Sequence, residues 1–189
     1  MTTIADWHAR ALSATGQVVA AISPDRWHTS TPCSQWTVRA LVNHLVSGNL
    51  WAAELGTGAT IKEVGQRLDG DVLGTDPAAA YAASAGSAAA AFSRPGALQD
   101  TCAVSYGPVT GAVYAGHRFI DVLVHGWDLA TATGQNPAID ADLVDACQQI
   151  AEPQIGMLRA SGAFGPPLPV PPGADAQTRL LAMLGRAVS

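Results

Sequence analysis

The chain has 189 residues, which is long enough for one domain with a complete core and does not require a second domain. Charged residues make up only 13% and the net charge is −5, so the clustered lysines and arginines of a nucleic-acid-binding protein are absent. No apolar run is long enough to cross a membrane, and charged residues interrupt the start of the chain where a signal peptide would need an apolar run. We therefore expect a cytoplasmic protein without nucleic-acid or membrane partners.

Apolar residues recur at helical spacing in four long segments, which predicts four main helices. These helices are expected over residues 3–22, 38–55, 78–92 and 109–133. Thr37 should cap the second helix, Asp76-Pro77 should open the third, and Gly134 should end the fourth. The connection over residues 58–75 is polar and has room for one short helix. Residues 97–108 alternate approximately between apolar and polar side chains, as a short extended segment does.

Two further helices are expected near the end of the chain, over residues 141–159 and 174–184, with a proline-rich stretch between them. The predicted fold class is therefore all-α: a four-helix bundle with an additional C-terminal helical segment. We expect a single domain over residues 1–189, in which residues 160–189 form a proline-rich extension with a short helix.

The candidate chemistry lies on the fourth predicted helix, in residues 119–130. Asp121 and His125 are four residues apart, so their side chains should project from the same face one turn apart. Their neighbours are mostly apolar, so much of this helix should be buried. A carboxylate and an imidazole in this arrangement form an incomplete metal site, and another part of the chain must provide the third ligand.

His44 is the best candidate for that third ligand, because it lies in the apolar middle of another long helix, where an imidazole needs a partner. His117 is less suitable, since His117, Asp121 and His125 together span about 12 Å of helix rise, while a ligand atom lies about 2 Å from its metal. Two imidazoles and a carboxylate suit zinc, nickel, iron or manganese, with zinc as the first expectation. Asp128 is expected to hold the second ring nitrogen of His44 or His125.

The same residues also have plainer interpretations. A single histidine in a helix is more often a hydrogen-bonded core residue than a ligand, and an Asp and a His four residues apart are a common helix pair. Asp128 could equally make a structural contact with the second helix. Cys147 should be a small buried residue rather than a nucleophile, and the three cysteines are too far apart to form a metal-binding pair.

Two motifs together resemble a known family. They are Thr31-Pro-Cys-Ser-Gln-Trp-Thr-Val-Arg-Ala-Leu-Val-Asn-His44 and Asp121-Val-Leu-Val-His-Gly-Trp-Asp-Leu-Ala130. They are similar to the mycothiol-dependent maleylpyruvate isomerase, metal-binding branch of the DinB-like superfamily, and the end of the chain is similar to a small single-domain subfamily of it. The resemblance implies a DinB-like four-helix bundle with up-down-down-up connectivity. It also implies a divalent metal held between helices by His44, Asp121 and His125.

The chain departs from this family in two respects. The isomerase has a glutamate at the position of Asp121, and the shorter side chain should either draw its helix closer to the ion or reach it through water. The isomerase also has a C-terminal domain that contributes to its active site. Here only residues 131–189 follow the second motif, too few for that domain and another helix. The isomerisation itself is therefore not the expected reaction.

We accordingly expect a metal-binding bundle that acts as a mycothiol-type thiol transferase or isomerase, presenting a low-molecular-weight thiol to a small electrophile. An alternative is a non-catalytic, dimeric interaction module, in which the helix over 78–92 provides the contact face and the three ligands form a structural metal or polar cluster. A third hypothesis is a metal-dependent hydrolase with Asp128 as its general base. An open ligand position would favour an enzyme, and a fourth protein ligand would favour a structural site.

Overall fold

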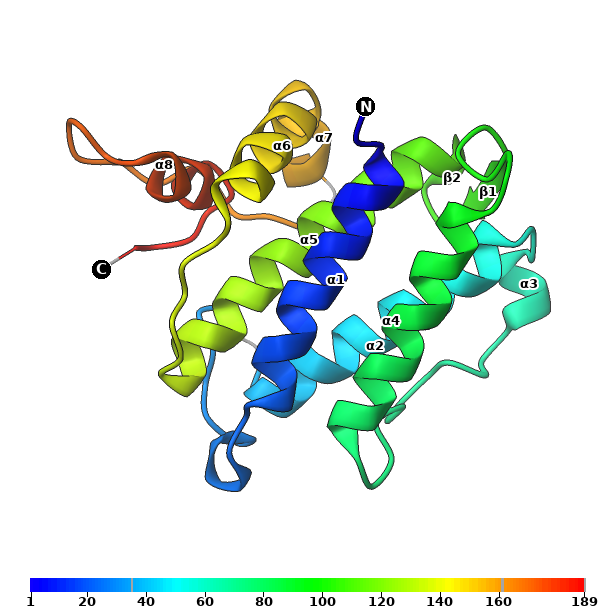
Figure 1. Cartoon of the computed structure of the whole chain (residues 1–189), viewed down its shortest axis with the longest axis horizontal. Helices are drawn as coiled ribbons and strands as arrows, with labels where there is room; N and C mark the ends of the chain where they lie inside the picture. The colour runs from blue at the N-terminus through cyan, green and yellow to red at the C-terminus, as the bar shows by residue number, and fades with distance from the viewer. Residues whose placement is uncertain (35, 161, 189) are drawn as a thin grey trace. The chain divides into compact units, whose positions relative to one another are not determined.

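The structure is a computed structural model that describes residues 1–34, 36–160 and 162–188 (Figure 1). The chain separates into two compact units, Met1–Asn136 and Pro137–Ser189. The second unit begins earlier than the extension that the sequence predicted from residue 160. The prediction of one domain over the whole chain stays a prediction, and each unit is described by itself.

Four long helices make up most of the first unit. They are α1 (Ile4–Ala20), α2 (Val38–Gly56), α4 (Pro77–Ser93) and α5 (Gly111–Thr133). α1 packs against α4 and α5, and α2 packs against the same two helices. In the colour order of Figure 1, the chain runs in one direction through α1 and α5 and in the opposite direction through α2 and α4. The all-α fold with up-down-down-up connectivity is thus confirmed.

Each of these helices begins with a side-chain cap, which accepts a hydrogen bond from a backbone N–H three residues further on. The capping residues are Thr3, Thr37, Asp76 and Thr110. Pro77 occupies the first helical position of α4, where its missing N–H costs nothing. Gly134 ends α5 at φ +72°, in the left-handed conformation that glycine adopts without strain. The caps predicted at Thr37, Asp76 and Gly134 are confirmed.

The connections contain short elements. A 3₁₀ turn, η1 (Pro24–Arg26), follows α1, and the polar connection after α2 contains α3 (Ile61–Val64). The segment that was expected to be extended forms an antiparallel hairpin of β1 (Thr101–Val104) and β2 (Gly107–Thr110), which leads directly into α5.

α1 and α5 approach each other closely at Gly126. A Cβ on this glycine would lie 2.3 Å from Oγ1 of Thr15, so no larger residue fits without a shift. The Thr15 hydroxyl donates a hydrogen bond of 3.1 Å to the carbonyl oxygen of Val122. The face of α5 that carries Val122 and Gly126 is therefore packed against α1, in line with the burial that the apolar pattern predicted for much of this helix. No helix in the described part of the chain has the length and apolarity needed to span a membrane.

The second unit contains α6 (Ala141–Ala151), a 3₁₀ turn η2 (Glu152–Gln154), α7 (Ile155–Ala160) and α8 (Ala176–Met183). The single helix predicted over 141–159 is wrong in one respect. Pro153 lacks an N–H and stands at the start of η2, which divides the segment into two helices. Cys147 is buried in α6, and burial raises the pKa of its thiol to about 12, which suits a core residue.

Candidate metal centre

His44 from α2 and the pair Asp121 and His125 from α5 come together in the first unit. Nε2 of His44 lies 3.2 Å from Oδ1 of Asp121, and Nε2 of His125 lies 3.5 Å from the same oxygen. One donor atom from each residue lies within 4.8 Å of the other two. Ligands about 2 Å from a tetrahedral ion are separated by roughly 3 to 4 Å. The donor set and its spacing therefore fit one small divalent cation.

Asp121 is held as a carboxylate by Arg118, one turn earlier on α5. Nη1 of Arg118 donates a hydrogen bond of 2.8 Å to Oδ2 of Asp121, which leaves Oδ1 facing the two imidazoles. Burial alone would raise the pKa of Asp121, but the charges of Arg118, His44 and His125 outweigh it and hold that pKa well below its usual value. A single oxygen of Asp121 is thus free to face a cation.

Arg118 is itself buried and fixed in place. Its Nη2 donates to Oδ1 of Asn49 at 3.2 Å, from the neighbouring helix α2. Gly48 makes room for it, because a Cβ at that position would lie 2.4 Å from Nη1 of the guanidinium. The sequence patterns did not identify Arg118, although its spacing of three residues from Asp121 on α5 is that of a helix pair. They did not identify Asn49 or Gly48, because these residues meet Arg118 only through the packing of α2 against α5.

The other ring nitrogen of His125 is engaged by Asp128. Nδ1 of His125 lies 2.9 Å from Oδ2 of Asp128, whose side chain is completely buried. A carboxylate at this distance accepts a hydrogen bond, so Nδ1 carries a proton. Burial would lower the pKa of His125. The negative charge of Asp121 and the hydrogen bonds with Asp121, Asp128 and Cys33 outweigh burial and raise that pKa well above its usual value. Of the two histidines that Asp128 was expected to serve, the structure places it on His125.

Cys33 is a member of this cluster that the sequence reasoning missed. Its thiol donates to Oδ2 of Asp128 at 3.4 Å and lies 3.8 Å from Nδ1 of His125. Cys33, His125 and Asp128 therefore form a second group whose donor atoms lie within 4.8 Å of one another. The only sequence clue was its place in the motif that ends at His44. Cys33 and Asp128 are 95 positions apart in the chain, so no local pattern could show their contact.

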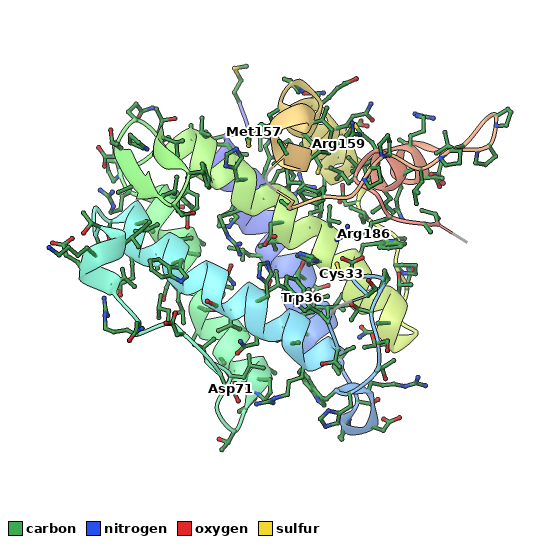
Figure 2. All side chains as sticks on the ribbon, turned by 180° about the vertical axis from the view of Figure 1, so that it is seen from behind. Cys33, Trp36, Asp71, Met157, Arg159 and Arg186 are labelled. Carbon is green, nitrogen blue, oxygen red and sulfur yellow. The ribbon has the colours of Figure 1, made fainter. Side chains whose placement is uncertain are left out.

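Trp36 covers the two histidines. The centroid of its ring lies 4.5 Å from that of His44 and 5.6 Å from that of His125. The backbone N–H of Trp36 donates to the carbonyl oxygen of Cys33 at 2.8 Å, and the Thr31 hydroxyl donates to the carbonyl oxygen of Trp36 at 2.9 Å. Figure 2 shows where Cys33 and Trp36 lie against the bundle. These hydrogen bonds hold Trp36 in place beside the two histidines.

His117 lies outside the group, in agreement with the reason for setting it aside. Its Nδ1 is 2.6 Å from the hydroxyl oxygen of Tyr106, in the turn between β1 and β2. One helix face therefore presents two histidines to different neighbours, because His117 and His125 are separated by about 12 Å of helix rise.

An open pocket of about 520 Å³ adjoins His44. Its walls include the indoles of Trp36 and Trp51 and the connection at residues 68–70. Asn43 holds that connection in place, because its side chain donates to the carbonyl oxygen of Gly70 and accepts from the backbone of Val72, both at 2.9 Å. The side chain of His44 is 34% exposed and that of Asp121 is 23% exposed, so solvent reaches the group from this side.

Comparisons with known proteins identify the family of the chain. Residues 8–130 match the family described as mycothiol maleylpyruvate isomerase N-terminal domain. Two proteins of Mycobacterium tuberculosis, Uncharacterized protein MT0763 of strain CDC 1551 / Oshkosh and Uncharacterized protein Rv0738 of strain H37Rv, are each 36% identical over 187 residues. Each alignment covers 96% of this chain and 96% of the relative. No solved structure matches the chain significantly. The chain belongs to the mycothiol maleylpyruvate isomerase N-terminal domain family.

Proposed function

We propose that this protein is a metal-dependent enzyme of the mycothiol-type thiol transferase or isomerase class, in which His44, Asp121 and His125 hold a divalent cation. The observation that carries the proposal is the convergence of two Nε2 atoms on one oxygen of Asp121, beside an open pocket. The family's description supports a small thiol as the co-substrate. The second reactant would be a small electrophile.

Of the two groups that share His125, the one with His44 and Asp121 suits the cation better. The Nδ1 side of His125 already has a hydrogen bond to Asp128, which is completely buried. The Nε2 side faces Asp121 and His44, which are partly exposed, and His44 lines the pocket. An exchangeable substrate position needs that exposure. Cys33 and Asp128 would then support His125 from behind.

A bound divalent cation lowers the pKa of a coordinated thiol or water and so supplies a nucleophile near neutral pH. The residues of the chain have supporting tasks. Arg118 occupies one oxygen of Asp121 and keeps the carboxylate charged, and Asp128 keeps the proton of His125 on Nδ1. Trp36 shields the two imidazoles on one side. Zinc is the first metal to test, and nickel, iron and manganese suit the same donors.

Two other functions were considered. An interaction module with a structural cluster is favoured by one observation: Arg118 ties Asp121 to Asn49, so the carboxylate is stabilised without a metal. In that case, dimerisation would depend on α4. A hydrolase that uses Asp128 as general base is less suitable, because Asp128 lies behind His125, hydrogen-bonded to Nδ1 and Cys33, and not on the side of the pocket.

The test is elemental analysis of purified wild-type protein beside His44→Ala, His125→Ala and Cys33→Ala, with His117→Ala as the matched control on α5. We expect nearly one metal per chain in the wild type, Cys33→Ala and His117→Ala, and none in the other two variants. Loss of the metal in Cys33→Ala, together with its retention in His44→Ala, would assign the cation to the group of Cys33, His125 and Asp128. Absence of metal from every sample, even after incubation with zinc and nickel, would refute the proposal and favour the interaction module.

Catalysis requires a separate measurement. We expect the metal-loaded wild type to accelerate the addition of mycothiol to a small electrophile, and His44→Ala to lose this acceleration. Retention of metal together with no acceleration for any thiol would favour a structural site. Sedimentation velocity of the wild type would show whether the protein is a dimer, as the sequence reasoning proposed.

A further inference from the structure

One face of α2 continues from the candidate metal centre towards the β-hairpin. His44, Ser47, Trp51 and Leu55 follow one another at intervals of three and four residues, so they share this face. The first three line the pocket at the metal centre. Trp51 and Leu55 line a second pocket, so the indole of Trp51 is common to both.

This second pocket has a volume of about 260 Å³ and is predominantly apolar. Its walls come from the end of α2, the start of α3, the hairpin and α5, and include Leu55, Ile61, Val104, Tyr106 and Tyr114. None of the residues that line it is charged. The hydroxyl of Tyr106 is hydrogen-bonded to His117 at 2.6 Å, so it needs no partner from a ligand.

We propose that the second pocket binds the hydrophobic tail of the substrate, whose polar head lies at His44, Asp121 and His125. This inference rests on the proposed function and specifies its substrate class: an elongated molecule with an alkyl or aryl tail. The helical rise between His44 and Trp51 is about 10 Å, so short substrates do not reach the pocket. The tail crosses the indole of Trp51 to enter it.

The size of the pocket favours part of a small molecule over other occupants. A complete small ligand usually occupies about 300–1,000 Å³, so this pocket suits one portion of a ligand that extends from the larger pocket. A helix of a second copy is about 10 Å wide and would need a long groove. Ile61 and Tyr106 are exposed at the pocket, which leaves it open to solvent in the single chain.

The experiment uses alkyl hydroxamates, whose head group binds zinc and whose tail length can be varied. Dissociation constants of acetohydroxamate, hexanohydroxamate and decanohydroxamate are measured by calorimetry on the zinc-loaded full chain. Acetohydroxamate reports on the metal centre alone. We expect the affinity to rise with chain length once the tail reaches the pocket, by up to about fourfold for each methylene that becomes buried.

Two variants distinguish binding of the tail in the second pocket from nonspecific hydrophobic binding elsewhere on the protein. Ile61→Glu places a carboxylate in the pocket, at a position in the first turn of α3 where an acidic residue suits the helix. Val113→Glu makes the same change at an exposed residue in the first turn of α5 that does not line the pocket. We expect Ile61→Glu to reduce the ratio of the acetohydroxamate and decanohydroxamate dissociation constants about tenfold, and Val113→Glu to leave that ratio as in the wild type.

The possible results have distinct meanings. Equal affinities for all three hydroxamates, or an equal effect of both variants, would overturn the tail pocket and leave the metal centre standing. No binding of acetohydroxamate in the presence of zinc would refute the metal centre itself, and the tail pocket with it. A wild-type dimer that Ile61→Glu, but not Val113→Glu, converts to monomers would assign the pocket to a second copy and overturn the proposal.

Discussion

The two sides of the His125 ring differ in what surrounds them. On the Nε2 side, Asp121 and His44 are partly exposed, His44 lines a pocket, and Asp121 is balanced by Arg118. On the Nδ1 side, Asp128 is completely buried and is held by hydrogen bonds from the ring and from Cys33. Carboxylates one turn before and one turn after the same histidine therefore lie in different surroundings: Asp121 is placed to face the cation that we propose, and Asp128 fixes the ring.

Among the changes at the metal centre, Asp121→Ala is expected to have the largest effect. Removal of this carboxylate should abolish metal binding and leave Arg118 buried without its anion, which should cost about 3 kcal/mol of unfolding free energy. Urea denaturation and elemental analysis would measure the two effects. Asp71→Ala is the matched control, because Asp71 pairs with Arg39 at 2.7 Å on the surface, where such a pair contributes less than about 1 kcal/mol. Equal losses of unfolding free energy in the two variants would show that Asp121 contributes no more to stability than a carboxylate in a surface ion pair.

Asp128→Asn tests the other side of the ring. We expect this variant to keep the metal but to bind it about 10- to 100-fold more weakly, because Asn still contacts Nδ1 but no longer provides a negative charge. A competition titration with a chromophoric zinc chelator would measure the change. If Asp128→Asn lost the metal as completely as Asp121→Ala, the two carboxylates would have the same task, contrary to the difference between the two sides of the ring.

Gly48→Ala should disturb the Nε2 side without altering any candidate ligand. The added methyl group would meet the guanidinium of Arg118, so we expect a loss of about 1–3 kcal/mol of unfolding free energy, together with weaker metal binding. Gly86→Ala on α4 is the control, since nothing lies within 4 Å of its added Cβ. There the same substitution should stabilise the protein by about 0.5–1 kcal/mol. A stabilising Gly48→Ala would mean that Arg118 moves aside at no cost.

His8 is a buried histidine that, unlike His125, has no acidic partner among the described residues, and this should make the stability of the protein depend on pH. Burial, with a smaller effect of the charge on Arg118, lowers the pKa of His8 to about 3. Neither of its ring nitrogens has a hydrogen-bond partner in the described part of the chain. Between about pH 6.5 and pH 3 the unfolded chain therefore binds one more proton here than the folded protein, so stability falls as the pH falls, by up to about 1.4 kcal/mol per pH unit.

His8→Leu should remove this part of the pH dependence, because leucine binds no proton in either state. Chemical denaturation of the wild type and the variant at several pH values between 4 and 7 would measure it. Parallel stability profiles for the two proteins would show that His8 is protonated in the folded state, in contradiction to its surroundings.

Local patterns determined most of the fold. The spacing of apolar residues and the caps at Thr37, Asp76 and Gly134 predicted the helices of the bundle, because a helix and its ends depend on neighbours within a few residues. The same local rule placed Asp121 and His125 on one face. It failed over 141–159, where the periodicity continued through Pro153 and hid the break between α6 and α7.

The sequence by itself determined the four long helices of the bundle and which two candidate ligands of α5 share a face, since both follow from the fixed geometry of a single helix. Only the tertiary structure decided that Asp128 contacts His125 rather than His44, and that Cys33 and Trp36 lie against these side chains. It also decided that Gly48 makes room for Arg118. Apart from the contact of Asp128 with His125, which lie three residues apart on α5, these contacts join residues of different elements. Their distances depend on how helices and loops pack, which no local spacing encodes.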